Sequence, residues 1–466
     1  MLDDAFISFR YAENLAAGNG PVFNVGERVE GYTTFLWVVL LSLGKLIGQD
    51  LVYFSRILGS IFAAVVLFLL FLSNRFNSQI DRPAAAIAVI FLGTCGVFAP
   101  WAISGMEVTL YTSLLLAAVL LHIREPGGAG QTGQAVMVGI VCAVAALTRP
   151  EGLMLFGILW LDQLLRSLRG RDRSAYYMLG VFLLPYIPYF CWRFSYYGYP
   201  LPNSFYAKVG STGAQVLRGL DYTSGFAWVA LPLLLLALPQ LFSPAWWRRH
   251  ERLRVIPVLC LAVICYTTMV GGDFMPAYRF FAPILPMICL LAALQVRSIP
   301  NSAVAAALVL VAVTFNIFQI RSGSDVGEWL HRNYIAWRGK EAGLWLRYNA
   351  PPDAVVATNT AGSVPYFSGL TAIDMLGVND SHIAHRQVES MGSGKPGHEK
   401  SDGDYVLARR PDFIIFGAAE GSFDPIFRSD LELSGNFDFI QLYRFRNHPL
   451  PSGRRLQLWE LRDRKR

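Results

Sequence analysis

Charged residues are scarce in this chain of 466 residues, where Asp, Glu, Lys and Arg make up 16% and hydrophobic residues 54%. Soluble domains carry about 25% charged residues, so the composition excludes a wholly soluble protein. It predicts a polytopic membrane protein with a soluble part attached. The formal net charge of +7 does not indicate nucleic-acid binding, because basic residues gather in the cytoplasmic loops of membrane proteins.

Several chemical motifs are absent as well. The sequence has no phosphate-cradling loop, zinc-ligand spacing or nucleophile elbow, so ATP-driven pumping and serine hydrolysis have no support. The six cysteines fall inside apolar runs and are expected to be small buried hydrophobic residues. His382 and His385 follow Asp380, but such a loop pair is more often solvated or structural than a metal site. The sequence therefore requires no cofactor and leaves a divalent metal open.

Apolar runs that could form membrane helices recur along the first 320 residues. A spanning helix needs about 20 mostly apolar residues. The runs cover 33–47, 53–73, 83–103, 107–123, 134–147, 150–165, 175–193, 226–243, 255–271, 279–296 and 302–320. The first of them is short and carries Lys45, so we expect it to lie at the outer surface. The others predict about ten transmembrane helices.

Basic residues crowd two short connections, Arg166–Arg173 and Arg248–Arg254. Both connections should be cytoplasmic, since Lys and Arg accumulate on that side. The loops 194–225 and 271–278, and everything after residue 320, then lie outside. Five polar stretches share this outer face: Asp3-Asp4, Ser104–Glu107, Thr148–Gly152, the 194–209 loop and Gly271–Pro276. Ionisable residues at membrane depth cost about 2.5–3.5 kcal/mol each and mark functional sites by default.

The character of the chain changes after residue 320, where charged residues become more frequent. Short β-like runs appear at 354–357, 413–416, 439–443 and 456–459, and segment 326–348 has helical spacing of its apolar residues. The Gly-rich segment 389–403 is expected to be a mobile loop. We therefore predict a mainly α transmembrane domain over 1–320, with a first outer loop at 1–32. A small extracytoplasmic α/β domain follows over 321–466.

The polar residues on the outer face have alternative interpretations. An Asp pair is most often a solvated turn or a helix N-cap, and Asp273 could cap the next helix or face a cavity. Arg149 and Glu151 bracket Pro150, where a helix must begin or kink, so they could form an ion pair that holds the bend. The aromatic residues of 196–206 could form an interfacial belt or a surface on which sugar rings stack.

These residues suit one kind of chemistry. A carboxylate that faces outward can take a proton from an attacking hydroxyl. Fixed cations can stabilise an anionic leaving group; the candidates are Arg10, Arg149, Lys208 and Arg279. A membrane enzyme without a nucleotide motif needs an activated donor outside the membrane. A lipid-linked phosphosugar meets this need, because it supplies its own leaving phosphate and partitions into the bilayer.

The first 33 residues resemble a known family. The segments 3–15 (DDAFISFRYAENL), 18–24 (GNGPVFN) and 26–33 (GERVEGYT) are similar to the first outer loop of the terminal arabinofuranosyltransferases of arabinogalactan and lipoarabinomannan synthesis. Those enzymes belong to the C-type superfamily of polyprenyl-phosphate-dependent glycosyltransferases. Further motifs of the family are similar to 104–107, 148–152, 271–275 and 373–380. The resemblance thus runs along most of the chain.

The resemblance implies transfer of a sugar, arabinofuranose by the match, from a polyprenyl-phosphate donor to a cell-envelope glycan or glycolipid. The reaction would take place on the outer face of the bacterial inner membrane. An acidic residue of the first loop is essential in the family; here it is Asp3 or Asp4, acting as a base or stabilising an oxocarbenium-like sugar. The expected substrate-binding residues are Arg10, Glu30, Tyr32, Glu107, Arg149, Glu151, Lys208, Asp273 and Arg279, with Arg149 and Lys208 near the lipid phosphate.

The chain departs from the family in two ways. The family's acidic pair follows a helix, whereas this polar start has none before it; we expect either a start placed too late or a first helix that is truly missing. The chain is also shorter than the cell-wall enzymes. The alternative function is a transporter or flippase of a lipid-linked glycan, although the internal repeats typical of transporters are not visible. A third interpretation is an assembly partner without activity.

Overall fold

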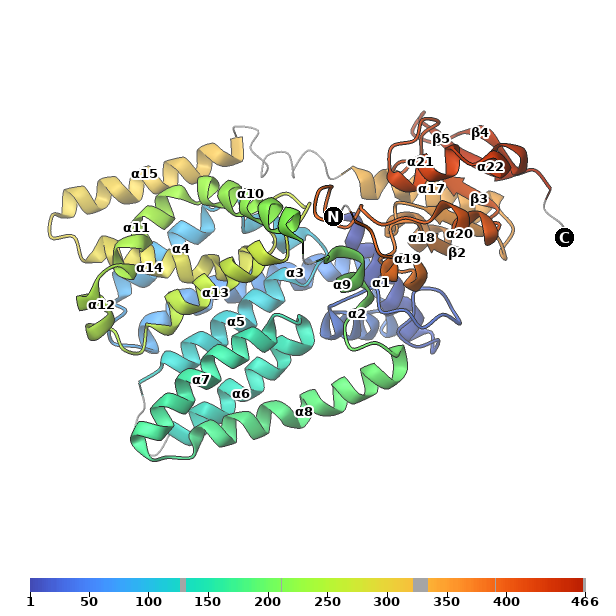
Figure 1. Ribbon diagram of the computed structural model, residues 1–466. Coiled ribbons are helices and arrows are strands. Elements are labelled where there is room, and N and C mark those ends of the chain that lie inside the picture. Colours follow the sequence, from blue (N-terminus) through green and yellow to red (C-terminus); the bar gives the residue numbers. More distant parts are fainter. Residues whose placement is uncertain (126–130, 211, 322–333, 390, 464–466) are drawn as a thin grey trace.

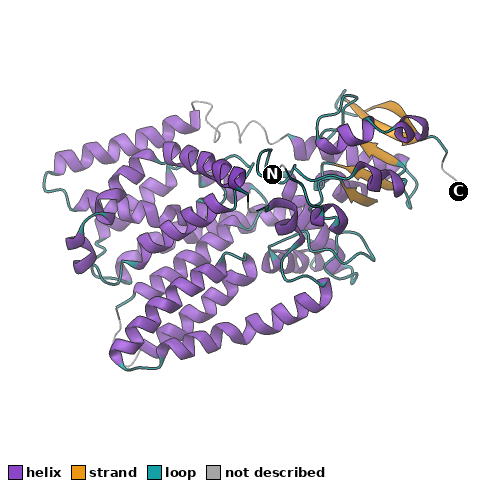
Figure 2. Cartoon of the chain, in the orientation of Figure 1, coloured by secondary structure: helices purple, strands orange, loops and turns teal. Residues whose placement is uncertain are grey.

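The computed structural model describes residues 1–125, 131–210, 212–321, 334–389 and 391–463. A body of long helices extends to residue 321, and a small α/β domain, here called the C-terminal domain, packs against one end of that body (Figure 1). Strands occur in the C-terminal domain and helices in both parts (Figure 2). The fold is thus mainly helical with a small C-terminal sheet, as the sequence predicts.

Every apolar run that the sequence singles out contains helix. Asp50 and Asp81 cap two of these helices, because their carboxylates accept hydrogen bonds from the first backbone N–H groups. The elements of the body are α1 (Asp3–Ala16), α2 (Phe35–Leu46), α3 (Leu51–Phe71), η1 (Leu72–Arg75), α4 (Arg82–Gly93), η2 (Ala99–Ile103), α5 (Val108–Ile123), α6 (Gln131–Thr148), α7 (Gly152–Gly170), α8 (Ser174–Tyr197), α9 (Asn203–Lys208), α10 (Gly213–Val229), α11 (Leu231–Leu241), α12 (Pro244–Arg249), α13 (Val255–Met269), η4 (Ala282–Ile284), α14 (Leu285–Arg297) and α15 (Ser302–Arg321).

Four described helices are long and apolar enough to cross a membrane: Leu51–Arg75, α6, α8 and Ser302–Ile320. A fifth span results if the consecutive helices α10 and α11 count as one. The predicted total of about ten spans stays a prediction. Helix α2 has 12 residues and is roughly 18 Å long, which is too short to cross a hydrocarbon core of about 30 Å. The surface position expected for 33–47 stays a prediction, since α4 has the same length and lies in a run that is expected to span.

The expected single helix over 226–243 is wrong. Helices α10 and α11 meet at Ala230 and are bent by 100° relative to each other. The second helix begins Leu231-Pro232, and proline both lacks a backbone N–H and clashes with the preceding turn. A straight helix therefore cannot continue through this point.

The C-terminal domain contains one five-stranded sheet in the order β2-β1-β3-β5-β4. Its strands are β1 (Val355–Thr358), β2 (Thr371–Asp374), β3 (Phe413–Ile415), β4 (Tyr443–Pro449) and β5 (Arg455–Leu461). β1 is parallel to β2 and β3, whereas β5 is antiparallel to β3 and β4. The helices are α17 (Ile335–Asn349), α18 (Ser363–Ser368), α19 (Ser381–His385), α20 (Gly403–Ala408), α21 (Arg428–Ser434) and α22 (Phe437–Leu442).

Three of the four predicted strands are confirmed, at 354–357, 413–416 and 456–459. The prediction at 439–443 is wrong, because most of that run lies in α22, where the Asn436 side chain accepts a hydrogen bond from the first turn. Strand β2 is not predicted, and of β4 the predicted runs cover only Tyr443. The helical segment expected at 326–348 lies partly outside the described residues, and its remainder falls in α17.

Helix α1 shares its apolar core with the C-terminal domain. Phe6 and Phe9 are fully buried, and the ring of Phe6 lies 5.4 Å from that of Tyr366 and 5.2 Å from that of Phe367. Aromatic pairs at such separations contribute about 0.5–1.5 kcal/mol beyond their buried area. The first helix is thus packed between the helical body and the C-terminal domain (Figure 1).

The cysteines differ in part from the expected burial. All six are free, and four are buried, but Cys191 and Cys265 are exposed on the surfaces of α8 and α13. An apolar run does not distinguish a helix face that packs inward from one that faces lipid, since both are hydrophobic.

Candidate active site

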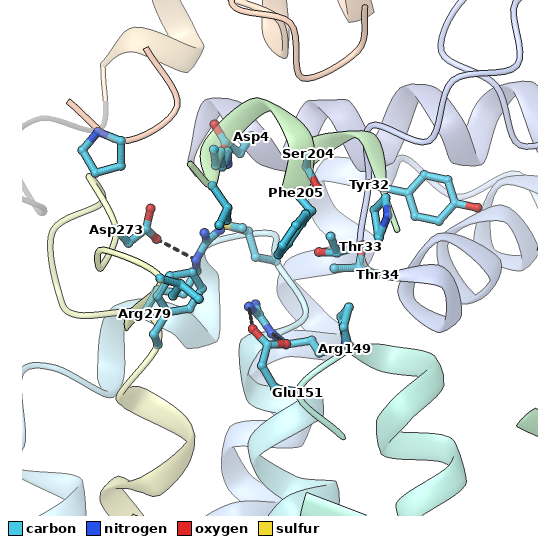
Figure 3. Close-up of a pocket in the computed structure, with 18 of the residues that line it drawn as sticks. Asp4, Tyr32, Thr33, Thr34, Arg149, Glu151, Ser204, Phe205, Asp273 and Arg279 are labelled. Atoms are coloured by element: carbon cyan, nitrogen blue, oxygen red, sulfur yellow. Dashed lines mark hydrogen bonds and ion pairs between the residues drawn. The ribbon is translucent and has the colours of Figure 1, made fainter. Parts of the chain in front are cut away.

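A cavity of about 280 Å³, here called the first cavity, lies where the helical body meets the C-terminal domain. All five polar stretches predicted to share one face contribute to its walls (Figure 3). The acidic and basic residues that line it are Asp4, Glu107, Arg149, Glu151, Lys208, Arg218, Asp273 and Arg279. The C-terminal domain contributes Pro396.

The two adjacent aspartates at the start of α1 have different environments. Asp3 does not line the cavity; its carboxylate accepts hydrogen bonds from the backbone N–H groups of Gly362 and Ser363, at 3.0 and 2.8 Å, and from the Ser363 hydroxyl at 2.5 Å. The backbones are so close that a Cβ on Gly362 would lie 1.9 Å from the Asp3 carbonyl oxygen. Asp3 therefore attaches α1 to the C-terminal domain.

Asp4 lines the first cavity. Over the described ranges its carboxylate accepts no hydrogen bond, and burial raises its pKa, while the nearby cations Lys208 and Arg279 act in the opposite direction. Helix α1 begins one residue earlier, so the positive end of its dipole also favours a carboxylate here. A carboxylate without a partner and with a raised pKa has the properties of a general base.

Lys208 is the last residue of α9 and also lines the cavity. Within the part of the chain that the structure describes, its ammonium has no ion-pair partner. Helix α9 lies between the helical body and the C-terminal domain (Figure 1). Its position is set by Asn203, whose amide donates to the carbonyl oxygens of Gly377 and Val378, each at 2.9 Å. An available cation therefore faces the same space as Asp4.

Arg149 is paired with two carboxylates. One nitrogen donates to Glu107 at 2.5 Å, and two others donate to Glu151 at 2.8 and 3.1 Å (Figure 3). All three side chains are buried, with at most 14% of each exposed. The ion pair that could hold the bend at Pro150 is thus present. Its two acidic partners make Arg149 a weaker candidate for a phosphate than Lys208.

Asp273 and Arg279 also form a buried ion pair, with 2.8 Å between Oδ2 and Nε, and both line the cavity (Figure 3). The loop between them turns sharply, since Ala277 and Tyr278 have positive φ values of 64° and 46°. Such strained backbone is common at functional sites. The carboxylate of Asp273 also accepts a hydrogen bond from the N–H of Phe274 at 2.9 Å.

Two residues expected to bind substrate, Arg10 and Glu30, do not line the first cavity. The Arg10 guanidinium donates to the carbonyl oxygens of Phe23, Pro365 and Leu370 at 2.5–2.7 Å. Glu30 is buried in an ion pair with Arg193 at 2.7 Å. Both side chains hold the first loop in place instead. Their partners are far away in the sequence, and no local signal identifies them.

Tyr32 lies at the cavity wall, but its hydroxyl is directed away from it and is 3.0 Å from the Tyr197 hydroxyl (Figure 3). It can therefore offer a substrate its ring but not its hydroxyl. The 196–206 aromatic residues divide in a similar way: Phe205 lines the cavity, whereas Tyr199 and Tyr206 enclose His385 of the C-terminal domain at 4.4 and 4.3 Å.

Sequence reasoning missed the pair formed by Arg218 and Glu399. Their side chains meet at 2.8 Å, and the other Glu399 oxygen accepts the N–H groups of Gly392 and Gly394 at 2.7 and 2.8 Å. These contacts place Pro396 against the cavity, so the described part of the Gly-rich segment 389–403 forms its roof. A lone Glu in a Gly-rich segment gave no reason to expect this.

No group of three or more potential ligands for a metal ion occurs among the residues that the structure describes. His382 lies 2.9 Å from Asp402 and stacks on Tyr405, and His385 stacks between two tyrosines. These histidines connect elements of the fold.

The buried His398 side chain should make the stability of the fold sensitive to acid. Burial lowers the pKa of His398 to about 4, and Lys395 and Lys208 act in the same direction. The unfolded chain binds this proton near pH 6.5, so stability is lost as the pH falls from 6.5 to 4, by at most about 3 kcal/mol. We expect His398→Asn to reduce the loss of melting temperature over this range. His382→Asn, at a half-exposed position, is the control; equal acid sensitivity of wild type and His398→Asn would contradict the prediction.

Part of the chain matches a known family profile, and a longer part is similar to a curated protein. A family profile described as a domain of unknown function (DUF8728) matches residues 318–459. A terminal beta-(1->2)-arabinofuranosyltransferase of Mycobacterium tuberculosis is 30% identical over 327 residues, which cover 62% of this chain and 51% of that protein. The chain thus spans about half the length of this curated relative.

Two solved structures resemble the fold. ArnT from Cupriavidus metallidurans bound to undecaprenyl phosphate aligns with a TM-score of 0.55 and 14% identity, over 80% of this chain and 81% of that one. The arabinofuranosyltransferase AftD from mycobacteria aligns with a TM-score of 0.50 and 13% identity, over 100% of this chain and 38% of that one. Over about half of its length, the terminal arabinofuranosyltransferase is thus similar in sequence to this chain, and the chain has the fold of the C-type glycosyltransferases.

Proposed function

We propose that this protein is an integral membrane glycosyltransferase that moves a sugar from a polyprenyl-phosphate donor to a cell-envelope glycan or glycolipid. The observation that carries the proposal is that Asp4 and Lys208, both without partners in the described residues, line one cavity at the end of a bundle of apolar helices. The curated relative is named for arabinofuranosyl transfer, so arabinofuranose is the donor sugar to test first.

In the proposed reaction an acceptor hydroxyl attacks the anomeric carbon of the donor sugar. The bond from this carbon to the phosphate oxygen breaks, a bond to the acceptor oxygen forms, and the electron pair leaves on the polyprenyl phosphate. Asp4 takes the proton of the acceptor hydroxyl. The ammonium of Lys208 stabilises the charge that develops on the leaving phosphate, with the Arg279 guanidinium nearby.

A narrow recess of about 20 Å³ continues from the first cavity between α5, α7 and α13. Its apolar lining includes Leu115, Met154 and Val263. It shares Arg149, Glu151, Tyr266, Arg279 and Phe280 with the first cavity. Solved ArnT, which has the same fold, is bound to undecaprenyl phosphate.

The experiment is sugar transfer by the purified full chain from a synthetic polyprenyl-phospho-arabinofuranose to a soluble arabinofuranosyl oligosaccharide. Release of polyprenyl phosphate together with an elongated oligosaccharide supports the proposal. No transfer with any donor sugar, combined with movement of the labelled lipid across proteoliposome membranes, would establish the transport alternative. The same proteoliposomes show on which side of the membrane transfer takes place. We expect transfer only when the acceptor is in the compartment that contains the C-terminal domain.

Substitution of Lys208 should weaken use of the donor. A hydrogen bond to a charged group contributes about 1.5–3 kcal/mol, so we expect Lys208→Met to raise the donor KM about 10- to 100-fold, with partial recovery in Lys208→Arg. The matched control is Lys45→Met, because Lys45 pairs with Glu13 at an exposed site away from the cavity. An unchanged donor KM in Lys208→Met would remove this residue from phosphate binding.

A further inference from the structure

A second cavity of about 460 Å³ lies beside the first, between α10 and the 271–278 loop. It shares Arg218, Asp273 and Pro396 with the first cavity, so the two spaces adjoin at these residues. Asp4 and the narrow recess belong to the first cavity alone. The second cavity therefore borders the site of the proposed reaction without including its base.

The walls of the second cavity differ from those of the first. Helix α10 contributes Asp221, Tyr222 and Ser224, and the facing loop contributes Phe274 and Tyr278. The Asp221 carboxylate and the Ser224 hydroxyl therefore lie among aromatic rings, while the Tyr222 hydroxyl is buried and leaves only its ring to the cavity. A sugar offers matching surfaces, since its hydroxyls bond to polar groups and its C–H faces pack on aromatic rings. A polyprenyl chain would bind poorly here, because it cannot form hydrogen bonds with the polar groups that it would cover.

The shape of the second cavity is set by close backbone contacts. A Cβ on Gly272 would lie 2.5 Å from the Tyr222 side chain, and one on Gly225 would lie 2.7 Å from the Tyr278 hydroxyl. The glycines let α10 approach the 271–278 loop closely and hold both tyrosine rings in place. The Arg218–Glu399 pair fixes the remaining wall, because it holds the segment that carries Pro396.

We propose that the second cavity binds the glycan acceptor, and that Asp221, Tyr222 and Ser224 select it. This inference rests on the proposed function, since it divides the two substrates of that reaction between the two cavities. The phosphosugar part of the donor occupies the first cavity, where Asp4 and Lys208 lie. The acceptor enters from the polar side, and its terminal hydroxyl reaches past Asp273 towards Asp4. The C-terminal domain then contributes to acceptor choice through the Pro396 wall.

The test separates acceptor use from donor use. Ser224 is exposed and lines the second cavity but not the first, so Ser224→Trp should obstruct only the second. We expect the acceptor KM for the soluble arabinofuranosyl oligosaccharide to rise at least tenfold, while the donor KM changes less than threefold. Asp221→Ala should raise the acceptor KM about tenfold. Leu220→Trp, on the exposed side of the same helix, is the control and should change neither constant.

Binding of the oligosaccharide to the full chain, measured by titration calorimetry, makes the result independent of turnover. Weaker binding to Ser224→Trp than to wild type and Leu220→Trp supports the acceptor site, even if no sugar is transferred and the proposed function fails. Equal binding and an unchanged acceptor KM in Ser224→Trp, with wild type active, would overturn the inference and leave the proposed function standing. Loss of binding in Leu220→Trp as well would also overturn it, because the effect would not be local.

Discussion

Asp4→Asn should lower the kcat of sugar transfer about 10²- to 10⁴-fold, the usual contribution of a general base. An amide has the shape of the carboxylate but cannot take the acceptor proton. Since burial raises the pKa of Asp4, kcat in the wild type should also fall as the pH is lowered through that raised value. In Asp4→Asn the residual kcat should not show this fall at low pH. The measurement is a pH profile of kcat for both proteins.

Asp3→Asn is the matched control, because it changes the neighbouring carboxylate in the same way. Burial raises the pKa of Asp3 to about 6 against the effect of three hydrogen-bond donors, and an amide oxygen can still accept from Ser363. We expect kcat within about tenfold of wild type and a loss of about 1–3 kcal/mol in stability. Full activity in Asp4→Asn together with an inactive, folded Asp3→Asn would assign the base to Asp3 instead.

Arg149→Met should strongly destabilise the protein. The substitution leaves Glu107 and Glu151 buried beside each other, with 2% and 14% of their side chains exposed, and removes the cation that both contact. Breaking a buried pair from one side costs about 3–5 kcal/mol. We expect a large fall in the melting temperature of the detergent-solubilised protein, and low yield.

Two controls define this effect. Glu107→Gln keeps the contacts between Arg149 and Glu151 and should melt much closer to wild type. Lys45→Met breaks an exposed ion pair with Glu13, which contributes about 0–1 kcal/mol. A melting temperature of Arg149→Met equal to that of Lys45→Met would mean that the triad does not stabilise the fold, and that Arg149 is available for a substrate.

The convergence of five polar stretches could be predicted, because each stretch follows or precedes an apolar run and the basic loops give the direction of every run. The division of roles between Asp3 and Asp4 could not. Successive residues on a helix point about 100° apart, so one carboxylate faces the cavity when the other faces Gly362. Which of them faces which depends on a C-terminal domain more than 350 residues away.

Other features could not be predicted because they depend on contacts between distant parts of the chain or on runs that are too short. Arg10, Arg193 and Arg218 find their partners across sequence separations of 163 to 360 residues, so a cation in the sequence does not reveal whether it is already paired. The run at 439–443 is too short for its apolar spacing to separate strand from helix. Asn436 just before it was the available sign of a helix start.

The contact of Arg10 with Pro365 spans 355 residues, which has a consequence for biosynthesis. Chains are made at about 5–20 residues per second, so Arg10 and Asp3 wait roughly 20 to 70 s after synthesis before their partners exist. During this interval the apolar face of α1, with Phe6 and Phe9, has no C-terminal domain to cover it. A nascent chain that stops before residue 363 would therefore present an uncovered helix to chaperones and proteases, and the Asp3 carboxylate would lack the partners that attach α1 to the C-terminal domain.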